Sequence, residues 1–225
     1  MIFTVLAPDR VHNSAGVECL HLLMRYLREL GHEVHHANYQ RSAQHEVKGI
    51  LIAPEVVDGI EFPHVRWCLN KPGLLGGPKS YPAGTKVFHF CPELEESARA
   101  ASPDGTSTEF MMGTIEVPEF FEIRQFRVWY RGKFQGEIGQ HDGSVLQMTR
   151  HWPPTKQEYW NLLKRTYKLY SYDDFSAVNL EAHLCGAQVL VHGKPYTPPA
   201  FADRLILNHD RNRDTVEKFV DMLTK

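Results

Sequence analysis

The sequence of 225 residues has no long hydrophobic run and no strong excess of charge of either sign. No stretch approaches the roughly 20 consecutive apolar residues that cross a bilayer, and the first residues, MIFTVLAPDR, lack the basic and apolar segments of a signal peptide. We therefore expect a cytoplasmic protein without a transmembrane segment. The net charge of −2 argues against bulk binding of nucleic acid.

Cysteine is also scarce, and its spacing excludes two common roles. The four cysteines, Cys19, Cys68, Cys91 and Cys185, are far apart and form neither a CxxC pair nor a Cys/His ligand spacing. A disulfide framework and a zinc site are therefore not expected, and buried free thiols are. The sequence contains no internal repeat of fixed period and no low-complexity tract.

What is present is an ordinary globular composition, with 42% hydrophobic and 23% charged residues, arranged as two cycles of strands and helices. In the first cycle, the pattern predicts strands near residues 2–6, 33–34, 47–52 and 86–90, with a helix before Gly31. In the second, it predicts strands at 127–130, 145–148, 167–170 and 188–191, helices at 155–165 and 176–185, and a last helix that starts with a capping box at Asp214 and Glu217.

Apolar runs that alternate with amphipathic helices are typical of βαβ units. We therefore expect an α/β fold with two Rossmann-like lobes that face a cleft, and with a C-terminal helix. Residues 1–120 are predicted to form the first lobe, and residues 121–225 the second lobe together with the terminal helix. Residues 92–108 are polar and are predicted to be irregular.

Charge is unevenly distributed between the two halves. Residues 1–120 carry 10 basic and 15 acidic side chains, whereas residues 121–225 carry 15 basic and 12 acidic ones. The stretch 124–168 alone has 9 basic and 3 acidic side chains. The second half is thus better suited to an anionic ligand, although no nucleic-acid-binding motif accompanies its basic residues.

The most informative segment is 170–186, where a strand end, a polar loop and a helix start follow one another. The free N–H groups and the dipole of a helix N-terminus favour a phosphate. Glu181, about one and a half turns into this helix, could accept hydrogen bonds from vicinal sugar hydroxyls. The alternative is that Ser176 or Asp174 is only an N-cap and Glu181 a surface residue.

SYDDFSAVNLEAHLCGAQVLV, in this segment, resembles the nucleotide-sugar-binding segment of GT-B glycosyltransferases. Arg131-Gly132-Lys133 resembles the basic loop of that family against the donor pyrophosphate, and Met148-Thr149-Arg150 resembles its segment beside the base. In the first half, Ser14-Ala15-Gly16 resembles the loop after the first strand, and Pro54-Glu55 resembles sugar-transferring relatives. The resemblance is strong over residues 124–193 and moderate over residues 1–75.

The resemblance implies a role for each matched position. Glu181 corresponds to the glutamate that binds the ribose, and Asp173 stands where retaining members place another acid, usually Glu. The implied donor-binding set is Arg131, Gly132, Lys133, Thr149, Arg150, Tyr172, Ser176, Ala177, Glu181 and Gly16. The implied catalytic set is Asp173 together with His12 and Glu55, the two candidate bases of the acceptor-binding first half.

The function that this resemblance implies is transfer of a sugar from a nucleoside-diphosphate donor of the uridine or guanosine type to an unidentified acceptor. No metal and no other cofactor is expected, because cationic side chains and a helix end would stabilise the leaving diphosphate. Two alternatives stay open, because the chain is short and the connection at 137–144, between two predicted strands, leaves little room for a full set of helices. These are a noncatalytic nucleotide-sugar-binding or scaffold protein and a nucleotide-sugar epimerase.

Overall fold

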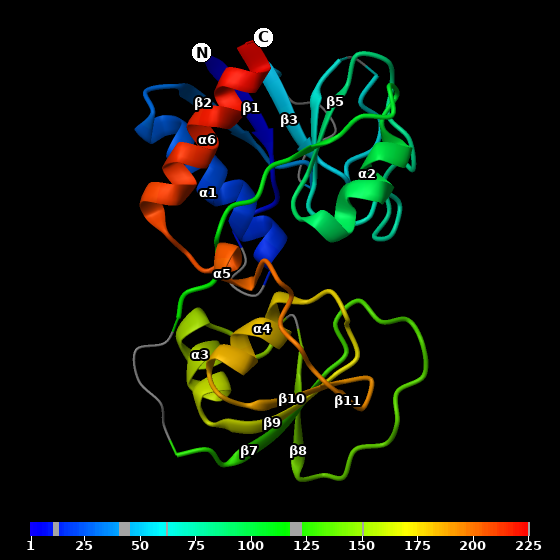
Figure 1. Cartoon of the computed structure of the whole chain (residues 1–225), viewed down its shortest axis with the longest axis vertical. Helices are drawn as coiled ribbons and strands as arrows, with labels where there is room; N and C mark the ends of the chain where they lie inside the picture. Colours follow the sequence, from blue (N-terminus) through cyan, green and yellow to red (C-terminus); the bar gives the residue numbers. More distant parts are fainter. Residues whose placement is uncertain (11–13, 41–45, 62, 118–122, 150, 225) are drawn as a thin grey trace. The chain divides into compact units, whose positions relative to one another are not determined.

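The computed structural model describes residues 1–10, 14–40, 46–61, 63–117, 123–149 and 151–224, so the predicted site residues His12 and Arg150 lie outside the described residues. The α/β class is confirmed, with two mostly parallel sheets and flanking helices (Figure 1). The chain divides into two compact units. Unit 1 comprises residues 1–11, 16–114 and 207–225, and unit 2 comprises residues 12–15 and 115–206.

The sheet of unit 1 is fully parallel and has the order β2-β1-β3-β4-β5-β6. Its strands are β1 (Ile2–Leu6), β2 (Glu33–Ala37), β3 (Ile50–Pro54), β4 (Val65–Cys68), β5 (Lys86–His89) and β6 (Thr108–Glu109). The order reverses at β1, which is the arrangement of doubly wound folds that bind ligands beyond the carboxyl ends of their strands.

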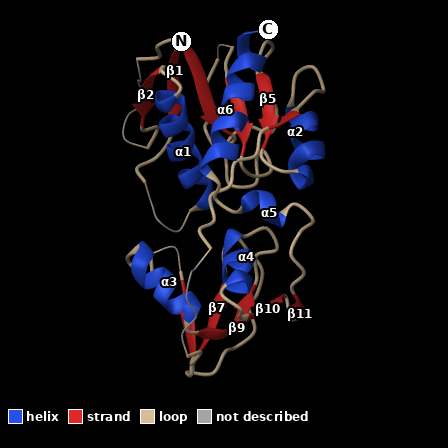
Figure 2. Cartoon of the chain, turned by 60° about the vertical axis from the view of Figure 1, so that its left-hand side comes forward, coloured by secondary structure: helices blue, strands red, loops and turns tan. Residues whose placement is uncertain are grey.

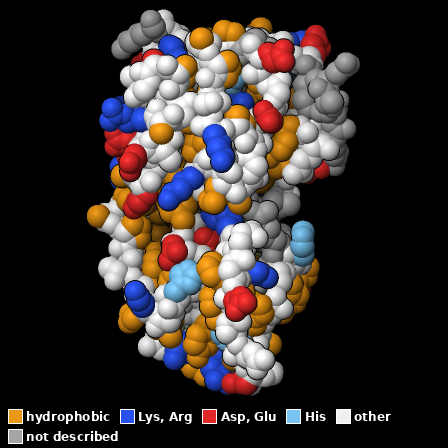
Figure 3. Space-filling model, turned by 90° about the vertical axis from the view of Figure 1, so that its right-hand side faces the viewer, with side chains coloured by type: hydrophobic (Ala, Val, Ile, Leu, Met, Phe, Trp, Pro, Cys, Tyr) orange, Lys and Arg blue, Asp and Glu red, His pale blue; other side chains and the backbone are white. Residues whose placement is uncertain are grey.

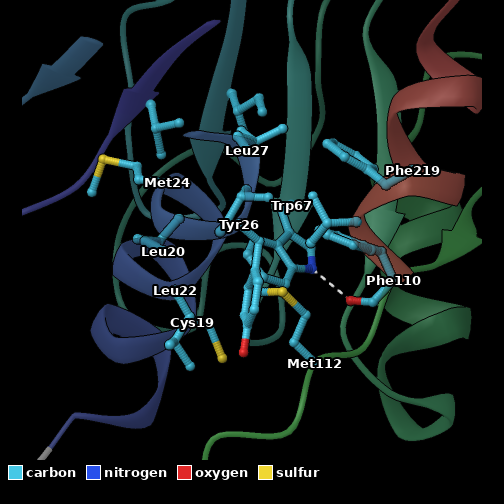
Figure 4. Packing of buried hydrophobic residues seen from close by; sticks show 14 of the residues in the cluster. Cys19, Leu20, Leu22, Met24, Tyr26, Leu27, Trp67, Phe110, Met112 and Phe219 are labelled. Atoms are coloured by element: carbon cyan, nitrogen blue, oxygen red, sulfur yellow. Dashed lines mark hydrogen bonds between the residues drawn. The ribbon is translucent and has the colours of Figure 1, made fainter. Parts of the chain in front are cut away.

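Two helices from opposite ends of the chain cover one face of this sheet: α1 (Ala15–Glu29) and α6 (His209–Thr224). Figure 4 shows their side chains meeting around Trp67 of β4. The Trp67 indole N–H donates to the Phe110 carbonyl oxygen over 2.9 Å, and Phe219 of α6 stacks on Phe110 with ring centroids 4.2 Å apart. Aromatic packing therefore joins the end of the chain to the core of unit 1.

The position of α6 differs from the sequence prediction, which grouped the terminal helix with residues 121–225. Its apolar side chains Val216, Phe219 and Val220 belong to the core that contains β1 and α1. The Asn212 amide also makes two hydrogen bonds with Gly113: its Oδ1 accepts from the Gly113 N–H, and its Nδ2 donates to the Gly113 carbonyl oxygen. The helix starts at His209, where Asn208 Oδ1 accepts from the Arg211 N–H, so the predicted start at Asp214 is wrong.

The opposite face of the unit 1 sheet packs against α2 (Glu95–Ala101) and against loops. The prediction of irregular structure over 92–108 is therefore wrong, because this stretch contains a 3₁₀ turn at Pro92–Leu94 followed by α2 and the start of β6. Small alanine side chains let α2 approach the sheet closely. The four cysteines are buried free thiols, as predicted.

The sheet of unit 2 has the order β11-β10-β9-β7-β8, and all of its pairs except β10 with β11 are parallel. Its strands are β7 (Phe126–Tyr130), β8 (Val145–Met148), β9 (Thr166–Ser171), β10 (Gln188–Val191) and β11 (Lys194–Pro195). The order reverses at β7, so the neighbouring carboxyl ends of β7 and β9 form the switch point of this sheet.

The helices α3 (Lys156–Lys164) and α4 (Ala177–Leu184) pack together on one side of this sheet, and a short helix α5 (Ala202–Leu205) joins the same core (Figure 2). Thr155 caps α3, as predicted, by accepting from the Glu158 N–H. The connection from β7 to β8, residues 131–144, contains no helix. One face of the sheet therefore has helical cover, and the other faces this connection.

The helices of the described part of the chain include none with the length and hydropathy of a membrane span.

Candidate functional site

The strongest candidate site lies where β7 and β9 end side by side in unit 2. Tyr130 and Ser171 are register partners at the ends of these strands, and the Tyr172 N–H donates to the Tyr130 carbonyl oxygen over 2.9 Å. The loop Arg131–Lys133 follows β7, and the segment 172–176 leads from β9 into α4. The parallel sheet thus brings together two segments that are some 40 positions apart in the sequence.

Asp173 fastens these two segments to each other. Its Oδ2 accepts from the Lys133 backbone N–H over 3.0 Å, and its Oδ1 accepts from the Phe175 backbone N–H over 3.2 Å. The Lys133 ammonium lies 4.0 Å from the same carboxylate and donates to the Phe175 carbonyl oxygen over 2.8 Å. Because Asp173 is only 6% exposed, these contacts fix the shape of the loop pair, that is, of the Arg131–Lys133 loop and the segment 172–176.

Gly132 is required by this close approach. Its φ of +59° lies in the left-handed region, and a Cβ atom at this position would overlap the Asp173 carboxyl group. The contact with Asp173 thus explains why a glycine stands at this predicted site position. The same contact excludes any larger residue here.

Arg131 is the more exposed cation of the loop. Its guanidinium donates to the carbonyl oxygens of Phe134 and Gly136, over 3.0 and 3.3 Å, so the side chain lies along its own loop. Together, Arg131 and Lys133 place two positive charges on the loop that faces the start of α4. Such a combination of cations with a helix N-terminus attracts anions.

The start of α4 carries the other predicted phosphate ligands, Ser176 and Ala177. Ser176 is the N-cap, and its hydroxyl accepts from the Val178 N–H over 3.3 Å. Ala177 is the first residue of the helix, which has no acidic side chain in its first turn. In the same first turn, the buried amide of Asn179 donates to the Asp173 carbonyl oxygen over 2.8 Å. Its Oδ1 has no hydrogen-bond partner among the described residues.

Glu181, the predicted ribose ligand, lies in α4 beside α3. The Tyr159 hydroxyl of α3 donates a hydrogen bond to Glu181 Oε2. Burial raises the pKa of Glu181 to about 7, and the Tyr159 hydrogen bond and the Lys156 charge offset only part of this rise. Burial also raises the pKa of Tyr159, and the neighbouring Glu181 carboxylate adds to that shift. The pair therefore joins α3 to α4.

The other predicted residues of unit 2 that the structure describes are Thr149 and Tyr172. Thr149 follows β8, where its N–H donates to the Trp152 carbonyl oxygen and its hydroxyl accepts from the His151 N–H. Tyr172 packs beside Phe134, and its hydroxyl bonds to His141 Nε2 over 2.9 Å. The structure thus assigns Thr149 to a turn and Tyr172 to the anchoring of the 131–144 connection.

In unit 1, the predicted residues Glu55 and Gly16 both lie next to Leu69. Glu55 directly follows β3, is 3% exposed, and accepts from the Leu69 N–H over 3.0 Å. A Cβ atom on Gly16 would meet the Leu69 side chain at 3.7 Å, an ordinary contact, so packing does not require glycine there. Glu55 thus holds the loop that follows β4, and its candidate role as a base stays a prediction.

Sequence reasoning missed Tyr159, Asn179 and His141 as part of this region. Tyr159 and Asn179 each lie within a helix, at positions that the periodic pattern treats as core, so their polar contacts leave no separate signal. His141 is one of 13 histidines, and its place depends on how the long connection folds back.

A comparison with models of protein families and with curated proteins finds no match for this chain.

Proposed function

We propose that this chain is a GT-B-type glycosyltransferase that takes a sugar from a nucleoside-diphosphate donor and transfers it to an acceptor hydroxyl. The observation that carries the proposal is the pairing of the Arg131–Lys133 loop with the Asp173–Ser176 segment at the switch point of a parallel sheet. This pairing sets two cations and a helix start at the strand ends where such sheets bind ligands.

The chemistry expected of this site is stabilisation of a leaving group. As the bond between the anomeric carbon and the phosphate oxygen breaks, its electron pair goes to the diphosphate, and the acceptor oxygen bonds to the anomeric carbon and loses its proton to a base. Arg131 and the N–H groups at the start of α4 would stabilise the added negative charge. The resemblance assigns the base to Glu55 or His12 and the ribose contact to Glu181.

The contacts of Asp173 support a positioning role within this mechanism. Its two carboxylate oxygens already accept two backbone N–H groups, and its ammonium neighbour is Lys133. A carboxylate with these partners is suited to shaping the diphosphate loop. The catalytic role that the resemblance implies for Asp173 therefore stays a prediction.

The test is calorimetric titration of the protein with uridine, guanosine, adenosine and thymidine diphosphates, followed by their sugar conjugates. We expect one diphosphate to bind, and Arg131→Ala to weaken its binding by about 10- to 100-fold, because a charge-assisted hydrogen bond is lost. Lys194→Ala, which removes an exposed cation from β11, is the matched control and should leave the affinity unchanged. If none of the four diphosphates binds, the proposal is wrong.

A second candidate is a noncatalytic nucleotide-sugar-binding protein. It is favoured by the fact that the carboxylates of Asp173 and Glu55 each accept backbone N–H groups. The two candidates differ in turnover, because a transferase releases free diphosphate when donor and acceptor are both present. Donor binding without diphosphate release across a panel of sugar, lipid and peptide acceptors would favour the noncatalytic protein.

A further inference from the structure

The face of the unit 2 sheet that lacks helical cover carries an aromatic row. Val128, Tyr130 and Leu169 point into the core with α3 and α4, whereas Trp129 and Tyr170 alternate with them along the strands and are only partly buried. Trp129 and Tyr170 are direct register partners on β7 and β9. The strands therefore present two neighbouring rings on the side that faces the 131–144 connection.

His141 of this connection joins the two rings. Its imidazole stacks on Trp129, with centroids 5.3 Å apart and 14° between the planes, and lies 5.2 Å from the Tyr170 ring. Its Nε2 also bonds to the Tyr172 hydroxyl. At the other end of the connection, Arg131 bonds to two carbonyl oxygens of the same loop. His141 thus holds the end of the connection against the sheet, and Arg131 holds the start of the connection in a turn.

A pocket of about 780 Å³ lies between this connection and the indole of Trp129. Small-molecule sites usually have volumes of roughly 300–1,000 Å³, so the pocket is large enough for an organic ligand. Its polar and aromatic lining includes Trp129, Arg131, Gln135, Glu137, Gln140 and His141. Gly136 and Gly139 also line this wall, and the Phe134 ring packs directly against Gly136.

The lining indicates the chemical class of the ligand. The formal charges of Arg131 and Glu137 in the lining cancel. On the face seen in Figure 3, acidic and basic side chains are interspersed. Two carboxamides and a carboxylate can donate to and accept from hydroxyl groups, while the part of the Trp129 indole that His141 does not cover offers an apolar surface for C–H groups. A ligand with many hydroxyls, apolar ring faces and no net charge satisfies all of these groups.

The neighbouring cations of the sheet are already engaged within the protein. The Arg127 guanidinium lies 3.2 Å from the Asp142 carboxylate, and the Lys168 ammonium lies 5.4 Å from the centroid of the Tyr170 ring. Arg131, which follows β7, donates to two carbonyl oxygens of its own loop. A single-stranded nucleic acid needs a row of available cations beside its stacking rings, and these three cations have partners within the protein. We propose that the pocket between Trp129 and residues 135–141 binds a neutral oligosaccharide.

The test is a glycan array that carries neutral, sialylated and sulfated oligosaccharides, probed with the full chain in the absence of any nucleotide. We expect selective retention on neutral glycans. Affinity for the best neutral glycan should fall by about tenfold or more in Trp129→Ala, which removes the aromatic surface, and by about three- to tenfold in Gln140→Ala. Tyr167→Ala, at an exposed tyrosine of β9 outside the pocket, is the control and should bind normally.

Gln140 is exposed, so Gln140→Ala keeps the test valid if Trp129→Ala fails to fold. The proposal is overturned if no glycan is retained, if only anionic glycans or a single-stranded oligonucleotide are bound, or if both variants bind like the original protein. Since nucleotide is absent throughout, these outcomes do not depend on whether the chain binds a nucleoside diphosphate.

Discussion

The two units use the same strand order at their switch points but cover their sheets differently. In each unit the first strand along the chain has the second strand on one side and the third on the other, and the fourth lies beyond the third. The order is β2-β1-β3-β4 in unit 1 and β8-β7-β9-β10 in unit 2. Unit 1 packs α1 and α6 on one face and α2 with loops on the other. In unit 2, the helices of the described residues pack on one face.

The strands reflect this difference in cover. All four residues of β4 in unit 1 are buried, as expected for a parallel strand covered on both faces. In β7 of unit 2, buried Val128 and Tyr130 alternate with partly exposed Arg127 and Trp129. Unit 1 therefore uses aromatic side chains such as Trp67 and Phe219 to fill a core, whereas unit 2 leaves Trp129 and Tyr170 only partly buried on the other face of its sheet.

The comparison also extends to the loops at the carboxyl ends of the strands. In unit 1, Glu55 after β3 and Asn70 after β4 are buried, and Glu55 accepts a hydrogen bond from the Leu69 N–H, whereas Asp9 and Arg10 after β1 are exposed. In unit 2, the loop after β7 is exposed and basic, and only its anchor Asp173 is buried. The more open and more cationic unit is therefore the better candidate for binding an anionic ligand.

The largest effect is expected in the core of unit 1. Phe219→Ala removes a fully buried ring that stacks on Phe110 and meets Phe88 edge to face, so unfolding should become easier by about 3–5 kcal/mol. Hydrogen exchange should accelerate in β1 and α1 and stay unchanged in β9 and α4. Lys218→Ala, at the exposed neighbouring position, should have little effect. Equal acceleration in both units would show that their cores are not independent.

The second effect concerns the loop pair of unit 2. Asp173→Ala leaves the N–H groups of Lys133 and Phe175 without their acceptor and removes the charge next to the Lys133 ammonium. Urea unfolding should show a loss of about 2–3 kcal/mol, with faster hydrogen exchange confined to unit 2. Asp174→Ala, at the adjacent 81% exposed carboxylate, is the control. A loss of equal size in the control would contradict the anchoring role of Asp173.

The third effect is a pH dependence from the Glu181–Tyr159 pair. Because burial raises the pKa of Glu181 to about 7, the folded state binds this proton more tightly than the unfolded state does. The stabilisation is complete below the ordinary pKa of about 4.5 and is lost as the pH rises to about 7. We expect a decrease of roughly 1–2 kcal/mol in the free energy of unfolding, since the side chain is partly exposed.

Glu181→Gln removes this titration, so the stability of the variant should change less between pH 4.5 and pH 7 than that of the original protein. Glu217→Gln, at an exposed glutamate of α6, is the control for general charge effects. Chemical unfolding at a series of pH values measures both. Identical pH profiles for the original protein and Glu181→Gln would rule out this linkage.

The sequence was sufficient to predict the class of the fold and most of its regular elements. Strands such as β1 and helices such as α1 carry a clear period in their own residues, so local pattern predicts them. The capping box at Thr155 is equally local. In contrast, the sequence did not predict β4 or α2, because the buried Arg66 interrupts the apolar run of β4 and the alanine-rich α2 has little amphipathic contrast.

The parts of the site that the sequence could not predict depend on contacts between distant segments. The sequence indicated both the basic loop and the segment before α4. It could not predict the hydrogen bond from the Lys133 N–H to Asp173, because these residues are 40 positions apart. In the same way, the partner of Glu181 is Tyr159 on another helix, and the terminal helix packs with β1 at the opposite end of the chain. Periodicity predicts which face of a helix is buried, but it does not predict which other element packs against that face.

The smallest effect separates two buried tryptophans, one in each unit. The Trp67 indole N–H donates to the Phe110 carbonyl oxygen, whereas the Trp160 indole N–H has no partner among the described residues. Trp→Phe shortens both side chains alike, but only Trp67→Phe also leaves a buried carbonyl without its donor. Trp67→Phe should therefore cost about 1 kcal/mol more than Trp160→Phe in urea unfolding. An equal or larger cost for Trp160→Phe would mean that its N–H is satisfied in solution, for example by an ordered water.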